Sequence, residues 1–393
     1  MRIGAPMKEL HFPCSVSRIE GTLQHYAWGG YCNIAQIERR PPSGLPEAER
    51  WYGTHPSAPA FVGGEELASI VKDHPSYALG PASSRNDLPF LIKLLDAAQP
   101  LSLQVHPNLQ QAQRGFEREN FSAIPHSSRN YQDPYPKPEV IIALSDLWAV
   151  VGFRQPSEIA RLIRDLRVLE LEEEASRFAS SREDHKVIEA IFGAWISQEH
   201  RSKLSALREA CESYRGSSSA TLEFVHVARK ISEAFPDDIG LLISLLLNCV
   251  KLSPGQALFT PANTLHAYIH GFGLEVMAPS DNVLRCAMTK KRRDLPELVQ
   301  LVDFKPRYPE VFDPFRDGGF TAENWFQVQM YRDSVDLPQN GAQIVMVTRG
   351  TVTIAGNHYN AGDGIWLPHC AGPQSIDTTS AEYAVISAPP EPN

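Results

Sequence analysis

One short pattern stands in two distant parts of this chain, and it constrains the possible fold more than any other feature. The segments Pro254–Pro261 (PGQALFTP) and Ala361–Pro368 (AGDGIWLP) each contain a turn glycine, a short apolar strand and a proline at the same spacing. Glycine permits tight turns, and proline ends a strand because it cannot donate to the hydrogen-bond ladder. The repeat therefore predicts two copies of one β module.

Length and charge limit the class of protein. A chain of 393 residues is too long for one ordinary hydrophobic core, so more than one domain is expected. Its formal net charge of -9 argues against nucleic acid or an anionic membrane as partner, because both require a basic surface. The first residues show no signal-peptide pattern, and the longest apolar run, residues 239–250, is too short to span a bilayer. We expect a cytoplasmic protein with neither a nucleic-acid nor a membrane partner.

The 6 cysteines are scattered along the chain. None belongs to a C-x-x-C pair, so the sequence indicates neither a thiolate zinc site nor a dense disulfide framework. We expect reduced thiols at all of these positions: Cys14, Cys32, Cys211, Cys249, Cys286 and Cys370.

Helical sequence interrupts the β-like sequence between residues 153 and 250. Apolar residues at positions 159, 162, 163 and 166 recur with the period of an amphipathic helix, and Ser157 is its expected N-cap. Further helices are expected at residues 170–176, 185–195, 200–214, 220–234 and 238–248, and strand-like sequence resumes at Val250. We interpret the whole region as a helical insertion within a β domain.

The stretch Leu101–Asn108 (LSLQVHPN) carries the first candidate ligands of a metal. Side chains alternate between the two faces of a strand, so Gln104 and His106 share one face while Leu103 and Val105 take the other. A Gln-x-His pair alone is more often an ordinary surface or core feature than a metal site.

Two more segments place charges in apolar surroundings. Prolines hold the chain extended before Lys137 and Glu139, which lie two apart and share a face as the next strand begins. Glu139 is either a third metal ligand or a solvated charge at the strand entry. Lys93 lies inside the apolar run 88–95, and it either meets an anion or reaches past an edge strand to water.

The repeated module resembles the second metal motif of the cupin jelly roll, G-x5-P-x4-H. The first copy supplies His266, whereas the second copy has Pro373 at that position. Gln104-x-His106 takes the place of the cupin H-x-H pair. Two imidazoles, a carboxylate and a neutral amide oxygen suit zinc, although iron also accepts two histidines and a carboxylate. The candidate metal ligands are Gln104, His106, Glu139 and His266.

Longer motifs are similar to type I mannose-6-phosphate isomerase, a family of the cupin superfamily. They are residues 26–29, 51–59, 89–95, 101–107, 137–139, 261–268 and 273–285 (GLEVMAPSDNVLR), so the resemblance covers most of the chain. It implies a mainly β fold of two cupin-type jelly-roll domains with an α-helical insertion. We expect a catalytic cupin domain from residues 1–152 and 251–310, the insertion at 153–250, and a cupin-like domain without a metal site at 311–393.

The resemblance also implies an activity: one Zn²⁺ per chain and isomerisation between mannose 6-phosphate and fructose 6-phosphate through an enediolate, in a monomer serving GDP-mannose biosynthesis. Such chemistry requires a base, an electrophile and cations for the phosphate. The implied catalytic residues are Arg285, Glu275, Asp281 and Lys137, with either carboxylate open as the acid or base. Family positions that suit phosphate or hydroxyl binding are Lys93, Ser102 and Lys291. Arg285 could instead form a salt bridge with Asp281, four residues earlier.

The chain departs from the family pattern at three places. Pro136 replaces a histidine, Asn108-Leu109 replaces Asp-Lys, and Thr289-Lys290-Lys291 replaces Thr-Pro-Lys. These changes leave open an isomerase with an altered sugar-phosphate preference. A sugar-phosphate-binding cupin without turnover also stays open, as does an iron-dependent cupin oxygenase, which Gln104 and the phosphate-matching lysines disfavour.

Overall fold

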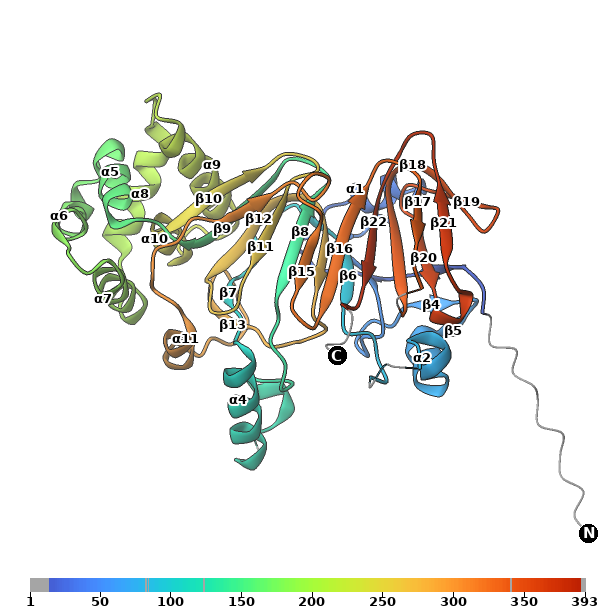
Figure 1. Cartoon of the computed structure of the whole chain (residues 1–393). Helices are drawn as coiled ribbons and strands as arrows, with labels where there is room; N and C mark the ends of the chain where they lie inside the picture. The colour runs from blue at the N-terminus through green and yellow to red at the C-terminus, as the bar shows by residue number, and fades with distance from the viewer. Residues whose placement is uncertain (1–13, 82, 84, 123, 340, 390–393) are drawn as a thin grey trace, which may run out of the picture. The chain divides into compact units, whose positions relative to one another are not determined.

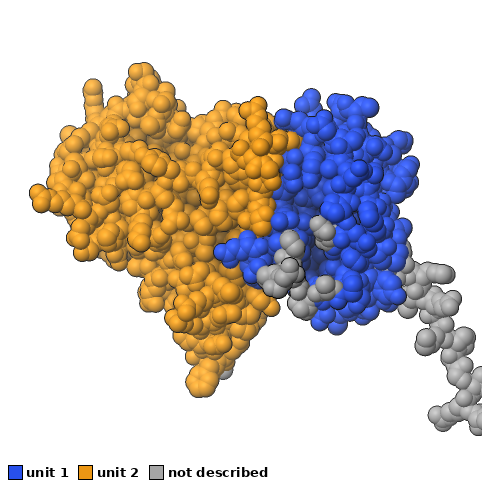
Figure 2. Space-filling model, in the orientation of Figure 1, with its two compact units in different colours: residues 1–22, 51–91, 323–393 blue, residues 23–50, 92–322 orange. Residues whose placement is uncertain are grey.

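The computed structural model describes residues 14–389 except residues 82, 84, 123 and 340 (Figure 1). Residues 1–13, which carry most of the expectation about a signal peptide, lie outside the described residues. The chain divides into two compact units (Figure 2). Unit 1 contains the described residues of 1–22, 51–91 and 323–393, and unit 2 contains those of 23–50 and 92–322. The expectation of a mainly β fold with a helical part is confirmed, whereas the domain boundaries expected from the sequence stay a prediction.

Unit 1 is an antiparallel β domain. Its main sheet runs in the order β16-β22-β18-β20-β1-β4-β5, and β18 also pairs with β19 and β21. Buried apolar side chains on these strands, from Leu337 to Val385, form its core. The strands are β1 (Ser17–Glu20), β4 (Phe61–Val62), β5 (Glu65–Glu66), β16 (Phe326–Tyr331), β17 (Val335–Leu337), β18 (Gln343–Ile354), β19 (Asn357–Asn360), β20 (Gly364–Leu367), β21 (Gln374–Asp377) and β22 (Ala381–Ser387). Its helices are α2 (Leu67–Asp73), α3 (Pro75–Ala78) and the 3-10 turn η3 (His369–Ala371).

Unit 2 contains two groups of paired strands that share the long strand β12 (His266–Met277). The first part of β12 pairs in the order β10-β9-β12-β7-β13, and its later part belongs to the order β14-β11-β8-β12-β6. The other strands are β6 (Leu91–Ala97), β7 (Leu103–Val105), β8 (Glu139–Ala143), β9 (Leu147–Phe153), β10 (Leu247–Leu252), β11 (Ala257–Thr260), β13 (Leu284–Ala287), β14 (Glu310–Phe312) and β15 (Phe320–Ala322). Strands β2 (Thr22–Gln24), β3 (Glu49–Tyr52) and β6 contain three of the points where the chain passes between the units.

The helical part lies between β9 and β10, which pair directly with each other. The insertion therefore leaves the sheet continuous, and its apolar helix faces pack with the sheet in one buried cluster. Its helices are α5 (Pro156–Leu166), η2 (Leu169–Leu171), α6 (Glu172–Ser180), α7 (Asp184–Ser197), α8 (Arg201–Ser213), α9 (Ser219–Ala234) and α10 (Gly240–Leu246). Outside the insertion, unit 2 has α1 (Asn33–Ile37), α4 (Leu109–Phe121), η1 (His126–Ser128) and α11 (Leu295–Leu301).

Two local predictions in the insertion are wrong. Gln155, not Ser157, caps α5, and it forms a capping box with Glu158, because Pro156 already takes the first helical position. The helix expected to reach residue 248 ends at Leu246. Leu247 instead begins β10, whose pairing with β9 outweighs the helical preference of an apolar run.

The sequence repeat has the same backbone conformation in both copies. Gly255 and Gly362, the turn glycines of the two segments, both have φ of 91°, which a side chain would strain. Each glycine precedes a short strand, β11 in the first copy and β20 in the second. The inference of a duplicated β module therefore agrees with the local structure.

The expectation that every cysteine is reduced is wrong for one pair. Cys14 and Cys370 form a disulfide with a Cα–Cα separation of 5.3 Å, which joins the segment before β1 to η3 within unit 1. The sequence could not reveal the pair because 356 positions separate the two residues. Among the described helices, none is long and apolar enough to cross a membrane.

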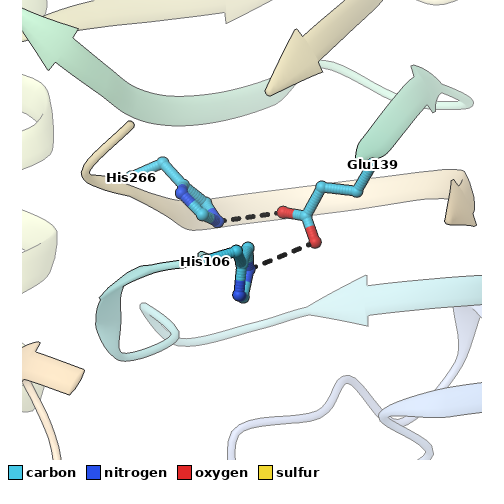
Figure 3. A group of neighbouring side chains, drawn as sticks. All are labelled: His106, Glu139 and His266. Carbon is cyan, nitrogen blue, oxygen red and sulfur yellow. Dashed lines mark ion pairs between the residues drawn. The ribbon is translucent and has the colours of Figure 1, made fainter. Parts of the chain in front are cut away.

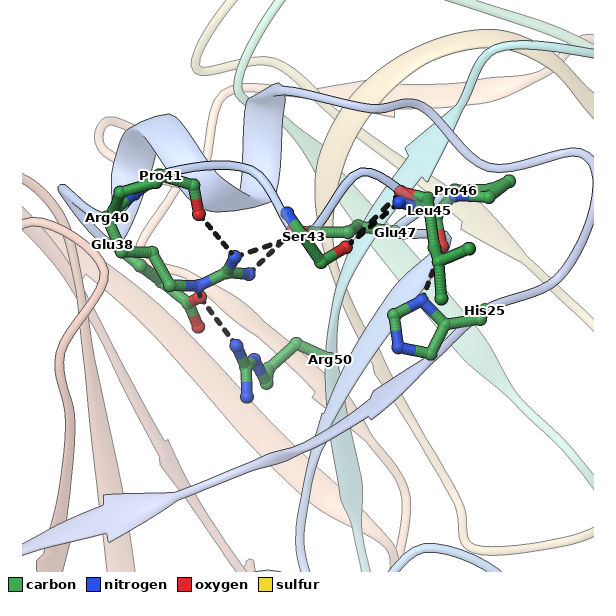
Figure 4. Close-up of polar contacts among 9 residues, drawn as sticks. All are labelled: His25, Glu38, Arg40, Pro41, Ser43, Leu45, Pro46, Glu47 and Arg50. Atoms are coloured by element: carbon green, nitrogen blue, oxygen red, sulfur yellow. Dashed lines mark hydrogen bonds and ion pairs between the residues drawn. The ribbon is translucent and has the colours of Figure 1, made fainter.

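A network of ion pairs holds the loop between α1 and β3 in unit 2 (Figure 4). The guanidinium of Arg40 donates to both carboxylate oxygens of Glu47, at 2.8 and 2.5 Å, and also to Glu38 at 2.7 Å. Arg50 donates to the same Glu38 carboxylate at 2.6 Å. The Glu47 side chain has 0% exposure, so the loop is fixed by a buried charge.

Candidate metal centre and active site

Three side chains from separate strands of unit 2 converge on one centre (Figure 3). His106 follows β7, Glu139 begins β8 and His266 begins β12. Their potential ligand atoms all lie within 4.8 Å of one another, and all three residues are buried. Pro107 follows His106 directly, as expected for a strand end, and Leu103 and Val105 point into the apolar core.

Hydrogen bonds fix which nitrogen of each histidine faces the centre. The Nδ1 atom of His106 lies 2.7 Å from the carbonyl oxygen of Asn282, and that of His266 lies 2.8 Å from the carbonyl oxygen of Thr264. A carbonyl only accepts, so each Nδ1 carries the hydrogen. The Nε2 atom of each ring therefore faces Glu139, at 3.5 Å from His106 and 2.9 Å from His266.

The electrostatics favour an anionic Glu139 carboxylate next to a neutral His106 ring. Burial and the neighbouring Lys137 together lower the pKa of His106 to about 4. Burial alone would protonate Glu139, but Lys137 and the two histidines hold the pKa of Glu139 well below its usual range. The Lys137 ammonium lies 2.6 Å from Glu139 Oε2 and 3.5 Å from His106 Nε2. Lys137 is thus in direct contact with two of the three converging residues.

These donors fit a metal ion. Glu139 Oε1 and His266 Nε2 are buried and have no hydrogen-bond partner among the described residues, which is costly unless another group satisfies them. Two imidazole nitrogens and one carboxylate are typical ligands of zinc. Backbone carbonyls that accept from the other nitrogen of each ring typically orient such histidine ligands.

Strand pairing connects Gln104 and Arg285 to this centre. Gln104 on β7 lies opposite His266 on β12 and opposite Arg285 on β13. Residues directly opposite each other in antiparallel strands share a face, so the three side chains share one side of the sheet. Ser102 Oγ donates to Gln104 Oε1 at 3.3 Å, and burial lowers the pKa of Arg285. Gln104 thus lies between a candidate ligand and a candidate anion-binding arginine.

A bend in β12 lets this one strand supply two site residues. The strand register shifts between Tyr268 and His270, and Gly271 has φ of 129° at a point where a Cβ atom would meet Leu147. An irregularity of this kind changes which residues face inward. After it, Glu275 pairs with Ile141, which lies on the same face of β8 as Glu139.

Lys93 lies next to two carboxylates and is buried. Its ammonium lies 3.3 Å from Glu275 Oε2 and 3.6 Å from Glu49 Oε1. Burial disfavours the charged lysine, but Glu49 and Glu275 raise the pKa of Lys93 above its usual value. Burial raises the pKa of Glu275. The interpretation that Lys93 reaches past an edge strand to water is wrong, since its side chain is 9% exposed.

Two other predicted site residues lie farther out. Asp281 and Lys291 are exposed, and each has an electrostatic interaction with at least one other residue near the site. Asp281, together with burial and Glu49, raises the pKa of Tyr26. Partial burial and the nearby Arg285 lower the pKa of Lys291. These relations place Asp281 within electrostatic reach of Tyr26 and Lys291 within reach of Arg285, outside the three converging residues.

Sequence reasoning missed three residues of the site. Glu49 is the second carboxylate that contacts Lys93. It lies just before the motif at residues 51–59, but no local sequence pattern indicated a role for it. Tyr268 lies two residues after His266, so strand alternation could have found it. Its buried hydroxyl has no hydrogen-bond partner among the described residues, and burial, Glu139 and Glu275 raise its pKa well above the usual value. The third is Asn282, whose carbonyl orients His106.

The sequence is similar to those of known enzymes. Residues 16–156 match the family model of the phosphomannose isomerase type I catalytic domain. The mannose-6-phosphate isomerase of Escherichia coli (strain K12) is 38% identical over 318 residues, which cover 77% of this chain and 79% of that protein. The chain belongs to the type I phosphomannose isomerase family. The enzyme class expected from the sequence is thereby confirmed.

Solved structures of phosphomannose isomerases have the same fold. A mannose 6-phosphate isomerase bound with zinc and yttrium superposes with a TM-score of 0.86 at 31% identity, covering 95% of this chain and 99% of the other. The apo form from Salmonella typhimurium gives the same values. The expected mainly β cupin fold with a helical part is confirmed.

Proposed function

We propose that this chain is a zinc-dependent isomerase that interconverts mannose 6-phosphate and fructose 6-phosphate by proton transfer through an enediolate. The single observation that carries the proposal is the convergence of His106, Glu139 and His266 within 4.8 Å. The strand that supplies His266, β12, also supplies the buried Glu275. A related structure contains zinc, and relatives carry the name of this activity. One Zn²⁺ would be held by His106, Glu139 and His266, with Gln104 as the fourth ligand.

Zinc, when bound, supplies a Lewis acid that polarises oxygen atoms of the open-chain sugar. Gln104 brings no charge to the site, so a ligand set that includes it neutralises less of the metal charge than one with a second anion. Lys137 lies beside Glu139 and is suited to hold a proton at the oxygen on which negative charge develops. The family has a histidine at the position of Pro136. Lys137 follows Pro136 directly and can carry a proton in place of that histidine.

Glu275 is the stronger of the two candidates for the base. The reaction removes a proton from the carbon beside a carbonyl and returns it to the neighbouring carbon, so one carboxylate can both take and give the proton. Glu275 is buried and has a raised pKa, which suits such a role, whereas Asp281 is exposed. Lys93 keeps a positive charge next to Glu275.

The phosphate and the enediolate need cations that have no fixed internal partner. Arg285 fits because its planar guanidinium binds oxyanions in a bidentate manner, and burial strengthens such contacts. Lys291 lies close enough for Arg285 to lower its pKa, and Ser102 can bind a sugar hydroxyl. We extend the proposal to a monomer acting in cytoplasmic sugar-phosphate metabolism that leads to GDP-mannose.

Turnover of mannose 6-phosphate by the purified chain, before and after chelation and zinc restoration, tests the proposal. We expect activity that chelation removes and zinc restores. A folded, zinc-loaded chain that binds the sugar phosphate without turnover would instead support the non-catalytic cupin. Turnover of a different sugar phosphate would support an altered preference, and full activity only with iron would overturn the zinc assignment.

A further inference from the structure

We infer that Asn282 and Asp133 are positioning residues that hold His106 in the tautomer and orientation required for metal binding. The inference rests on the metal centre of the proposed function, but it concerns residues that touch neither metal nor substrate. Only one contact among the described residues fixes the His106 ring from behind, the 2.7 Å bond from Nδ1 to the Asn282 carbonyl oxygen. The position of that carbonyl therefore sets the direction of His106 Nε2.

The side chain of Asn282 locks its own backbone in place. Its amide nitrogen donates to the carbonyl oxygens of Asp133 and Tyr135, both at 2.8 Å, and its amide oxygen accepts from the backbone nitrogen of Gln132 at 2.7 Å. The residue has 0% exposure. Asn282 thus inserts between the backbone groups of residues 132–135, and these contacts leave its carbonyl little freedom.

Asp133 also binds the loop of residues 280–282, through its carboxylate. Its carboxylate accepts from the backbone nitrogen of Asp281 at 2.9 Å, from that of Tyr135 at 3.0 Å, and from the hydroxyl of Ser280 at 2.9 and 3.1 Å. One carboxylate therefore joins residues 133–135 to residues 280–282. The segment that leads to Lys137 and Glu139 and the loop behind His106 are held as one piece.

This arrangement has a consequence for the metal centre. A histidine ligand binds well only if its second nitrogen has a fixed acceptor, and loss of such supports typically costs about 10- to 100-fold in metal affinity. Loosening of the 280–282 loop should let the His106 ring rotate or change tautomer. It should weaken zinc binding without removing any ligand.

The test measures zinc affinity of the folded apo protein by competition with a chelator. We expect about 10-fold or greater weakening in Asn282→Ala and a smaller loss in the same direction in Asp133→Asn, which keeps the side-chain shape. Thermal unfolding of each apo variant establishes that the protein compared is folded. If Asn282→Ala does not fold, Asp133→Asn decides the question.

Asp238→Asn is a matched control. The Asp238 carboxylate also accepts from a backbone nitrogen two residues ahead, Gly240 at 2.7 Å, and from one in a distant segment, Met288 at 2.9 Å. In the described part of the chain, it supports no carbonyl that contacts a candidate ligand. We expect this variant to lose stability comparably with Asp133→Asn while its zinc affinity stays that of the wild type.

The nitrogen resonances of the His106 ring provide a second readout, assigned with His106→Ala. We expect a pure Nδ1–H tautomer in the wild-type apo protein and a mixed pattern in Asn282→Ala. Unchanged zinc affinity and an unchanged ring pattern in both folded variants would overturn the inference. Because neither readout uses turnover, an inactive wild-type enzyme would refute the proposed reaction and leave this inference standing.

Discussion

The Lys93 ammonium lies 3.3 Å from the Glu275 carboxylate, and their side chains are only 9% and 4% exposed. A buried ion pair is weak evidence for stability, because removing charges from water can cost more than the pair regains. Buried charged groups with shifted pKa values are therefore candidates for a functional role. The pair lies on neighbouring strands of the site, since β6 lies next to β12. Substituting Glu275 and Lys93 one at a time should therefore distinguish an effect on turnover from an effect on stability.

Glu275→Gln should abolish most turnover while keeping zinc. The amide preserves the shape of the side chain but cannot accept the transferred proton, and loss of a general base typically costs about 10²- to 10⁴-fold. The measurement is kcat together with zinc content by mass spectrometry. Asp281→Asn is the companion variant: a greater loss there than in Glu275→Gln would transfer the role of base to Asp281.

Lys93→Met should destabilise the fold as well as reduce activity. Without the ammonium, Glu275 and Glu49 are buried close together without their shared cation, and breaking a buried pair from one side costs about 3–5 kcal/mol. Urea unfolding of the apo protein at pH 7 measures the effect. Stability should recover in part at lower pH, as Glu275, whose pKa burial raises, becomes protonated. A loss that does not change with pH would contradict this explanation.

His266→Ala and Arg285→Ala should separate metal binding from anion binding. Removing His266 takes away a candidate ligand, so both zinc occupancy and activity should be lost. Arg285→Ala should leave zinc occupancy near that of the wild type and lower turnover, because the arginine is opposite Gln104 and outside the three converging residues. Loss of zinc from the arginine variant would contradict the role given to Arg285.

Acid should weaken the loop held by Arg40 and Glu47 (Figure 4). The hydrogen bonds from Arg40 lower the pKa of Glu47 to about 2, from an ordinary value of 4.5. A folded-state pKa below the unfolded one stabilises the protein above pH 4.5, and this contribution, of the order of 3 kcal/mol, disappears as the pH falls toward 2. Denaturation of wild type and Glu47→Gln across this range measures it. The stability difference between the two proteins should shrink as the pH falls; a constant difference would argue against the linkage.

The Cys14–Cys370 disulfide predicts a count of thiols. Alkylation of the unfolded, non-reduced protein should label the 4 free cysteines, Cys32, Cys211, Cys249 and Cys286, and reduction should expose 2 more. Intact mass gives the number directly. Labelling of six thiols without reductant, in protein purified without one, would restore the interpretation made from the sequence.

Much of the site was encoded locally. Strand alternation placed Gln104 and His106 on one face and Leu103 and Val105 in the core, and the proline-rich entry delivered Lys137 beside Glu139. The repeat with its turn glycines predicted the duplicated β module. Residues close together in the sequence are enough to specify each turn and the strand that follows it. Such features depend on backbone periodicity and turn conformation, which a short stretch of sequence fixes.

Other features depended on which distant segments meet. Glu49 reaches Lys93, Asn282 reaches His106 and Cys14 reaches Cys370 because separate segments are brought together by pairing and packing, and no short motif records these partners. The same cause explains why α10 ends at Leu246 and not at residue 248, as the sequence predicted. From Leu247 onward the chain pairs with β9. The sequence by itself determined the residue types, the strand faces and the family of this protein. The tertiary structure decided the partners of each buried charge, because burial and proximity are properties of the packed chain and change the energy of every ionisable group that they enclose.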